Sequence, residues 1–227
     1  GQVPPGLYHD EAQHGIDALT VLDGSLPLYF AANNGREPIF VYLVSVFVAL
    51  LGRNPLAVRL PSFFIGVLTL AATYDLARTL WGPRIGRWAL AVLSVTFWHV
   101  HLSRVGFRAV LLPLFTALWL GQIVRAWKYQ RQRTKNIRLK SHTAYVRLQS
   151  KAWVSAAVAG LLYGLSWYTY IAARFTPVAL AFFVMYALLM DAVNSRRQGV
   201  EALKAVARAH WRNAILFCAS ALIDLPS

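Results

Sequence analysis

The longest uncharged stretch of the chain decides its fold class. Between Lys151 and Arg174, residues 152–173 read AWVSAAVAGLLYGLSWYTYIAA, a run of 22 residues without a charged side chain. A helix needs about 20 predominantly apolar residues to cross the hydrocarbon core of a bilayer. This stretch therefore predicts a transmembrane helix.

Shorter runs of the same kind occur on both sides of this stretch. They lie at residues 60–74, 88–103, 109–124 and 175–190, and aromatic and snorkelling side chains at their ends extend each one toward the length of a span. The sequence thus predicts an all-α, polytopic transmembrane bundle with about five full spans. The apolar run 215–223 is too short to cross, and residues 1–7 lack an initiator Met and a signal-peptide pattern. We therefore expect a chain truncated at both ends.

Residues 39–51 form an apolar run of a different kind. They are closed by Pro38 and Gly52 and number only 13, whereas a crossing helix needs at least about 17 residues. This length favours a short juxtamembrane helix on the membrane surface. We expect residues 1–54 to form an outer loop with amphipathic helices and residues 55–227 to form the transmembrane region. If 39–51 crossed the membrane, residues 1–37 would change sides, and the sequence leaves that alternative open.

The composition excludes a soluble protein. Hydrophobic residues make up 57% of the chain and charged residues 14%, and the mean hydropathy is +0.46. The formal net charge is +14, but the basic residues lie between the apolar runs, which is typical of membrane topology and gives no reason to expect a nucleic-acid partner. The single cysteine, Cys218, excludes a disulfide framework and a cysteine metal site.

Orientation follows from the positions of Lys and Arg. With residues 1–54 outside, the segments 78–87, 125–151 and 191–212 are inside and hold 17 of the 23 basic residues. The opposite orientation would translocate 125–151, which we expect to be a loop with nine basic residues and no acidic one. The positive-inside rule disfavours that orientation. We expect a multi-pass protein of the cell membrane whose site faces outward.

Two adjacent carboxylates, Asp10 and Glu11, lie in the predicted outer loop just before the amphipathic stretch 16–22. One interpretation is local, because Asp10 would cap a helix and Glu11 would complement the helix dipole. The other interpretation is catalytic, because a positioned carboxylate can take a proton from an attacking hydroxyl. The local sequence alone does not decide between them.

Four arginines fall on the same predicted face, namely Arg36, Arg104, Arg108 and Arg174. Guanidinium groups hold phosphate through paired hydrogen bonds, which lysine cannot offer. Each could also anchor a helix end at the headgroups. Together with a carboxylate, they indicate a site that binds a sugar phosphate and transfers the sugar.

Several segments resemble one family of membrane enzymes. They are the Asp10-Glu11 pair, Glu37-Pro38 opening a short helix, Ala57-Val58-Arg59-Leu60-Pro61-Ser62, Phe97 to Arg104, and Tyr168-Thr169-Tyr170. This pattern resembles the bacterial dolichyl-phosphate-mannose-type mannosyltransferases, a glycosyltransferase family 39-like group of the GT-C superfamily. The group is similar to the protein O-mannosyltransferases and to the aminoarabinose transferase of lipid A.

The resemblance implies an inverting glycosyltransferase that transfers a hexosyl or pentosyl group from a polyprenyl-phosphate-linked sugar to a protein, lipid or glycan acceptor. It implies Asp10 as the catalytic base and Glu11 as its neighbour. The sequence departs from the family at two places: Phe107-Arg108-Ala109 lacks the second carboxylate that many relatives have, and Glu37 stands where many have Lys. These departures favour Arg104 or Arg108 as the donor-phosphate contact.

Four histidines, His9, His14, His99 and His101, also fall on the predicted outer face. We expect them as acceptor or sugar contacts. An alternative is that they bind Zn²⁺ or Mn²⁺ with Asp10 and Glu11, although no spacing matches a metal motif, and we expect no metal cofactor. A secondary transporter or a non-catalytic membrane scaffold are the other function classes that the sequence leaves open.

Overall fold

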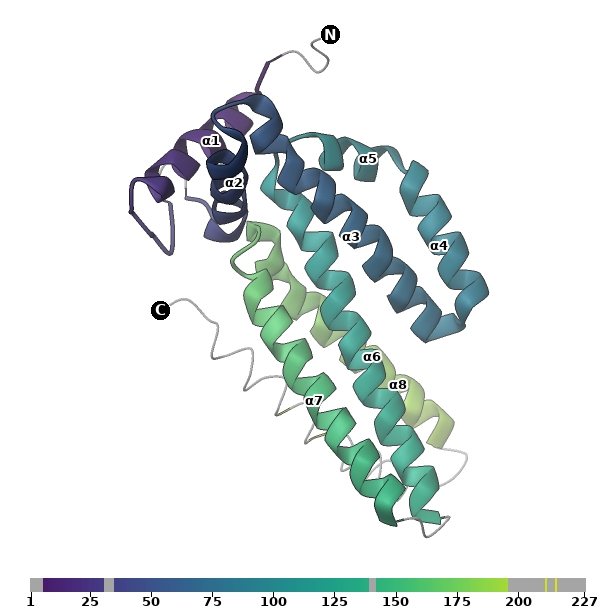
Figure 1. Ribbon diagram of the computed structural model, residues 1–227. Helices are drawn as coiled ribbons and strands as arrows, with labels where there is room; N and C mark the ends of the chain where they lie inside the picture. Colours follow the sequence, from purple (N-terminus) through teal and green to yellow (C-terminus); the bar gives the residue numbers. More distant parts are fainter. Residues whose placement is uncertain (1–5, 31–34, 139–141, 196–210, 212–214, 216–227) are drawn as a thin grey trace. The chain divides into compact units, whose positions relative to one another are not determined.

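The computed structural model describes residues 6–30, 35–138 and 142–195, with residues 211 and 215. Within these residues the chain forms helices and no β-strand, which confirms the all-α prediction. The elements are α1 (His9–Leu22), α2 (Pro38–Leu51), α3 (Pro55–Trp81), α4 (Pro83–Val95), α5 (Phe97–Arg104), η1 (Arg108–Val110), α6 (Leu111–Arg138), α7 (His142–Ser166), η2 (Ile171–Phe175) and α8 (Thr176–Ser195) (Figure 1).

The chain divides into two compact units. The first consists of residues 1–118 and 165–171, and the second of residues 119–164 and 172–227. The first unit holds α1 to α5, η1 and the start of α6, and it contains the candidate site. The predicted division between an outer loop, residues 1–54, and a transmembrane region, residues 55–227, stays a prediction.

Helix α2 matches the predicted short helix closely. Pro38 occupies its first turn, where the missing N–H has no helical partner to lose, and Gly52 ends it with a φ of 81°. Its 14 residues extend about 21 Å, less than the thickness of a bilayer core. The placement of α2 on the membrane surface stays a prediction.

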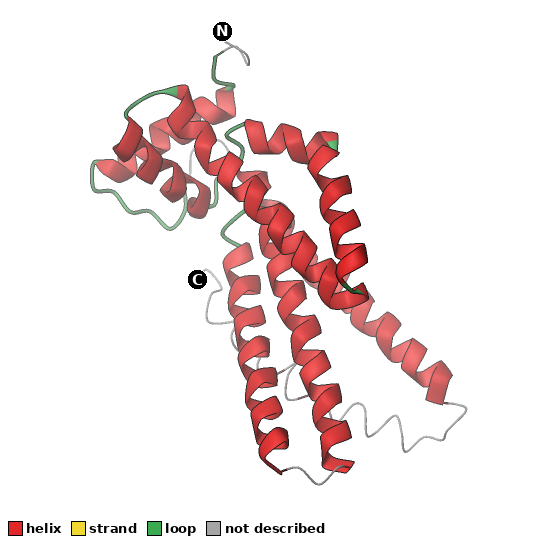
Figure 2. Ribbon diagram, turned by 45° about the vertical axis from the view of Figure 1, so that its right-hand side comes forward, coloured by secondary structure: helices red, strands yellow, loops and turns green. Residues whose placement is uncertain are grey.

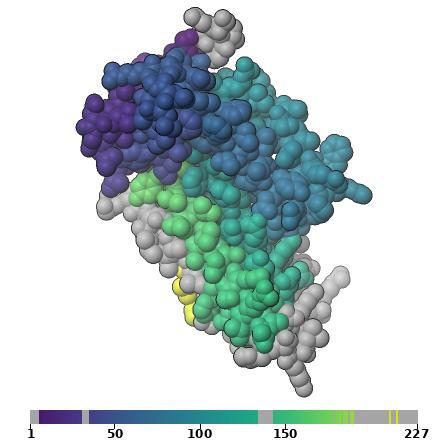
Figure 3. All heavy atoms as spheres, in the orientation of Figure 1, coloured from purple at the N-terminus to yellow at the C-terminus, as the bar shows by residue number. Residues whose placement is uncertain are grey.

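Apolar packing joins α2 to its neighbours in the first unit. Phe40, Val41 and Val44 of α2 are completely buried, together with Ala18 of α1 and Ala57 of α3. Burying one Val or Phe side chain stabilises a fold by about 1.5–3 kcal/mol. The space-filling view shows α1 and α2 closely packed at one end of the unit (Figure 3).

Helices α3 and α4 form an antiparallel pair that lies side by side in both ribbon views (Figure 2). Asn54 caps α3 by accepting a hydrogen bond from the Ala57 N–H at 2.9 Å. The pair turns at Gly82, which has a φ of 97°, and Pro83 then begins α4. The predicted span 60–74 lies inside α3.

The prediction of one continuous span over 88–103 is wrong. Helix α4 ends at Val95 and α5 begins at Phe97, because Thr96 has an extended backbone with a ψ of 123°. The Thr96 hydroxyl donates to the Val92 carbonyl at 2.8 Å, a back-bond that is often found where helices bend. An uncharged run gives no sign of such a break.

The prediction of a loop over 125–151 is also wrong for the described residues. Helix α6 continues to Arg138 and α7 begins at His142, so only residues 139–141 lie outside the described part. Arg, Lys and Gln are good helix formers, and they extend both helices beyond the apolar runs. At the other end α7 stops at Ser166, so the run 152–173 is not a single helix.

Two of the described helices, Pro55–Trp81 and Arg108–Arg133, are long and apolar enough to cross a membrane by length and composition. They contain the predicted spans 60–74 and 109–124. The run 175–190 lies almost entirely in α8, and its crossing stays a prediction, as does that of α7. Most of 191–212 and the short run 215–223 lie outside the described residues.

Candidate functional site

Glu11 lies in the first turn of α1 and is 1% exposed. Its Oε1 accepts hydrogen bonds from Arg59 Nε at 2.8 Å and from the Gly106 N–H at 2.7 Å. Its Oε2 accepts from Arg59 Nη2 at 2.8 Å and from the Tyr8 N–H at 2.9 Å. One carboxylate therefore joins the start of α1, the first turns of α3 and the loop that follows α5.

The surroundings of Glu11 keep its carboxylate ionised. Burial alone would raise the pKa of Glu11, but the hydrogen bonds from Arg59, Gly106 and Tyr8 outweigh burial and hold the pKa below its ordinary value. Both carboxylate oxygens already accept two hydrogen bonds each. This geometry is suited to a carboxylate that fixes neighbouring segments. It is less suited to a general base, which needs a free oxygen to accept a proton.

Gly106 fits against α3 only because it has no side chain. A Cβ at this position would lie 2.9 Å from Val58 Cγ1 and 3.0 Å from the Val58 carbonyl oxygen, both closer than ordinary contacts. The loop therefore approaches α3 tightly enough for its N–H to reach Glu11. This contact fixes the backbone between Arg104 and Arg108 relative to α1.

Asp10, the neighbour of Glu11, has a different environment. Its side chain is 65% exposed, and Oδ1 lies 3.9 Å from Nδ1 of His9, which is itself exposed. The two adjacent carboxylates are thus divided into one enclosed group and one that is exposed to solvent.

Two further ion pairs lie in the same unit. Arg36 Nη1 lies 3.2 Å from Asp17 Oδ2, and both side chains are buried. Arg108 Nη1 lies 3.1 Å from Glu37 Oε2, and its guanidinium packs 5.7 Å from the centroid of the Tyr170 ring. We call Glu11–Arg59, Asp17–Arg36 and Glu37–Arg108 the ion-pair cluster. Two predicted donor contacts, Arg36 and Arg108, are therefore each paired with a carboxylate, and their phosphate-binding role stays a prediction.

His14 is buried beside this cluster. It is 1% exposed, its ring lies edge-on to Phe40 at a centroid distance of 5.1 Å, and neither ring nitrogen has a hydrogen-bond partner among the described atoms. Burial, followed by the charges of Arg36 and Arg108, lowers the pKa of His14 to about 4. The imidazole is therefore neutral at pH 7. The side chain is enclosed, and its contact with a sugar or an acceptor stays a prediction.

The remaining predicted residues lie on helix surfaces. Arg104 is exposed at the end of α5, and the structure gives it no carboxylate partner among the described residues. His101 is exposed and stacks on Phe97 with a centroid distance of 5.7 Å, whereas His99 is half-buried. Arg174 is an exposed residue of η2, in the second unit.

The alternative metal site does not assemble among the described residues. They contain no group of three or more His, Cys, Asp or Glu side chains placed to hold a metal ion, and all six residues considered for it are described. The expectation that the protein needs no metal cofactor stays a prediction.

Residues 35–138 match the family of dolichyl-phosphate-mannose-protein mannosyltransferases. This part of the chain is mannosyltransferase-like. The matched stretch includes Arg36, Glu37, Arg59, Arg104 and Arg108, while α1 with Asp10 and Glu11 precedes it. The match supports a membrane glycosyltransferase with a lipid-linked donor. A bacterial origin and a particular member of the group stay predictions. No curated protein sequence and no solved structure matches the chain.

The local sequence does not reveal the partners that hold the ion-pair cluster together. Arg59 stands in the sequence as part of the motif Ala57 to Ser62, and no local pattern assigns a role to Asp17 or Gly106. Arg59 did carry a signal, because a cation among Ala57, Val58 and Leu60 requires a buried carboxylate or a route to water. For Gly106 no signal was available, since its importance comes from the approach of Val58.

Proposed function

We propose that the protein is a membrane glycosyltransferase that moves a sugar from a polyprenyl-phosphate donor to an acceptor hydroxyl, with Asp10 as general base. The observation that carries the proposal is the division of the adjacent carboxylates. Glu11 is held by four hydrogen bonds, and Asp10 is open at 65% exposure. The similarity of residues 35–138 to the mannosyltransferases supports the same reaction class.

In the proposed reaction the acceptor O–H gives its proton to the Asp10 carboxylate while the acceptor oxygen attacks the anomeric carbon of the sugar. The bond between that carbon and the phosphate oxygen breaks, and polyprenyl phosphate leaves with the electron pair. Attack from the side opposite the phosphate inverts the configuration at the anomeric carbon.

The remaining residues have supporting roles in this proposal. Glu11 positions α1 and thereby Asp10, because its hydrogen bonds reach α3 and the Gly106 loop. Arg104 binds the donor phosphate, since it is exposed and has no described carboxylate partner. The site faces the outer side of the cell membrane, in keeping with the distribution of basic residues.

The test is an Asp10→Asn variant of the full-length protein, assayed for sugar transfer in membranes supplied with a panel of polyprenyl-phosphate sugars. We expect the rate to fall by at least about 100-fold, because general base catalysis contributes that much or more. Asp23→Asn is the matched control, since Asp23 is an exposed carboxylate at the other end of α1. Undiminished transfer by Asp10→Asn would remove Asp10 from the catalytic role.

A further inference from the structure

The basic parts of α6 and α7 lie side by side in the second unit. Three side-chain contacts join the two helices: the rings of Trp119 and Tyr163 at a centroid distance of 5.4 Å, Lys151 Nζ at 5.9 Å from the ring centroid of Tyr129, and Arg133 Cζ at 5.2 Å from that of Tyr145. The α7 residue moves back along the chain as the α6 residue advances, so the helices are antiparallel, as both ribbon views show (Figures 1 and 2). The seam between them continues from the apolar parts of the helices into their basic parts.

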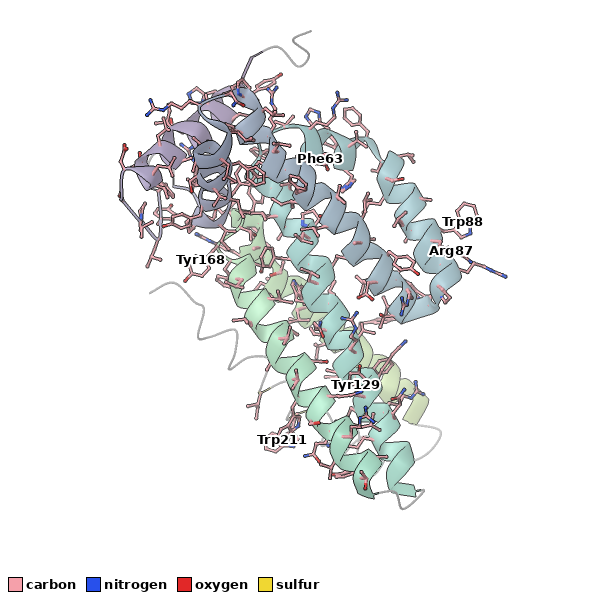
Figure 4. The ribbon with its side chains drawn as sticks, in the orientation of Figure 1. Phe63, Arg87, Trp88, Tyr129, Tyr168 and Trp211 are labelled. Carbon is pink, nitrogen blue, oxygen red and sulfur yellow. The ribbon has the colours of Figure 1, made fainter. Side chains whose placement is uncertain are left out.

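Cationic side chains gather on the sides of the helices that meet at this seam. On α6, Arg133 follows Tyr129, which is labelled in Figure 4, by four residues (Figure 4). On α7, Lys151 follows Arg147 by four residues, and both are exposed. Residues four apart share one side of a helix, and the contact of Lys151 with Tyr129 shows that these two sides face each other. We call Tyr129, Arg133, Tyr145, Arg147 and Lys151 the basic seam.

The basic seam has no acidic partner on its own helices. The sequence contains no Asp or Glu between Asp75 and Asp191, so neither α6 nor α7 offers a carboxylate. The Nε–H of Arg133 is enclosed and has no hydrogen-bond partner among the described atoms. An enclosed donor of a charged group is unfavourable when it is left unpaired, and like charges gathered at one place repel each other. A bound anion would relieve both.

The basic seam lies next to the apolar parts of its two helices. Lys151 directly precedes the uncharged run 152–173, and Arg125 directly follows the run 109–124. Helix α6 is long and apolar enough to cross a membrane. Tyr129 lies about one helical turn beyond Arg125, and Arg133 lies about two turns beyond it, distances over which a long basic side chain can reach back to the headgroup layer. The anions present at that depth are the phosphates of phospholipids.

We propose that the basic seam is a binding site for an anionic phospholipid. The lipid phosphate binds Arg133 and Lys151, Arg147 adds a third cation, and the acyl chains lie along the apolar parts of α6 and α7. Basic pockets between membrane helices are suited to anionic headgroups, and the rings of Tyr129 and Tyr145 hold the two cations at the seam. The site belongs to the second unit and takes no part in the proposed sugar transfer.

Two other exposed arginines distinguish a site from general attraction by positive charge. Arg131 belongs to the same stretch but lies two residues from Arg133, and residues at that spacing do not share a side of a helix. It lies over Trp127 of its own helix. Arg87 of α4 projects away from α3 (Figure 4). An anion that is attracted only by the excess of positive charge would respond to both arginines.

The experiment titrates the full-length protein in neutral detergent with phosphatidylglycerol, and native mass spectrometry measures the Kd of the first bound lipid. Phosphatidylglycerol should bind more tightly than zwitterionic phosphatidylcholine. Arg133→Gln and Lys151→Gln should each raise the Kd for phosphatidylglycerol by about tenfold, the loss expected for one charge-assisted contact. Arg131→Gln and Arg87→Gln are the matched controls and should leave this Kd unchanged.

Three results would overturn the proposal. The first is an unchanged Kd in both Arg133→Gln and Lys151→Gln. The second is an equal rise of Kd in the two control variants, which would mean general electrostatic attraction. The third is displacement of the lipid by glycerol phosphate or by a short RNA at the same concentration, which would mean a soluble phosphate or a nucleic acid as the ligand.

Cross-linking of the unaltered protein provides a test that does not depend on the folding of a variant. Phosphatidylglycerol with a photoreactive group in its headgroup, in nanodiscs of phosphatidylcholine, should label the basic parts of α6 and α7. Labelling confined to the turn between α3 and α4 would contradict the site. Neither measurement involves turnover, so the lipid site can fail while Asp10→Asn is inactive, and it can hold while Asp10→Asn still transfers sugar.

Discussion

The ion-pair cluster of the first unit and the basic stretch 125–151 of the second both concentrate arginine, but in opposite ways. In the cluster each of three arginines is within 3.2 Å of a carboxylate oxygen. The basic stretch holds nine Lys and Arg residues and no acidic one. Three of its described cations lie over aromatic rings, with Arg131 over Trp127 at 5.7 Å, Arg133 over Tyr145 at 5.2 Å and Lys151 over Tyr129 at 5.9 Å.

The difference separates two uses of the same side chain. A buried ion pair fixes the relative positions of distant segments, because either partner alone would be a buried charge. A cation over a ring near the surface contributes weakly and leaves the segment free to meet solvent or headgroups. Among the described residues, Arg36 and Arg108 are each paired with a carboxylate and Arg104 is not, so a count of arginines on one face overestimates the cations left to bind an anion.

The largest effect is expected where a buried pair is broken. Arg59→Ala leaves the Glu11 carboxylate buried without its cation and should reduce the free energy of unfolding by about 3–5 kcal/mol. Thermal unfolding of the purified protein in detergent checks this. Arg53→Ala, at an exposed position just before α3, is the control and should have little effect. Equal losses in both variants would contradict the structural role of the cluster.

A smaller effect is expected from acid. The pKa of His14 is lowered to about 4 in the fold and is about 6.5 in an unfolded chain, so the unfolded state binds the extra proton between these values. Stability due to the neutral imidazole is complete above pH 6.5 and decreases as pH falls toward 4. Between pH 7.5 and 5 the loss should be about 2 kcal/mol. Glu11, whose pKa is lowered, adds its own loss only below about pH 4.5.

His14→Leu separates this titration from all others, because leucine has a similar volume and does not ionise. The variant should unfold at nearly the same temperature at pH 7.5 and pH 5, while the parent protein should not. A parent protein whose unfolding temperature is the same at both pH values would show that the imidazole is hydrated and not enclosed beside Arg36 and Arg108.

Much of the fold could be predicted because its signals are local. The charge-free runs mark the apolar parts of α3 and α6, and Pro38 and Gly52 mark both ends of α2. The break at Thr96 could not be predicted, since one hydroxyl bonded to the Val92 carbonyl decides it. The polar composition after residue 124 suggests a loop, but α6 continues to Arg138 because Arg, Lys and Gln favour helix.

The candidate site was predictable only in part. The Asp10-Glu11 pair stands out in the sequence, but its division into an exposed and an enclosed carboxylate depends on Arg59, 48 residues away, and on Gly106, 95 residues away. Contacts at such separations follow from how α1 packs on α3 and on the loop after α5. Local patterns carry no information about that packing.

The smallest effect is expected in the basic stretch. Arg131→Gln removes an exposed cation from the exposed face of Trp127 and should cost about 0.5–1 kcal/mol. Arg147→Gln is the matched control, because the structure places no described ring or carboxylate against the Arg147 side chain. Combining Arg131→Gln with Trp127→Leu should cost no more than Trp127→Leu alone, since the two groups act through one contact. A loss for Arg131→Gln as large as that for Arg59→Ala would mean that the basic stretch is held together as firmly as the ion-pair cluster, and the distinction between the two regions would fail.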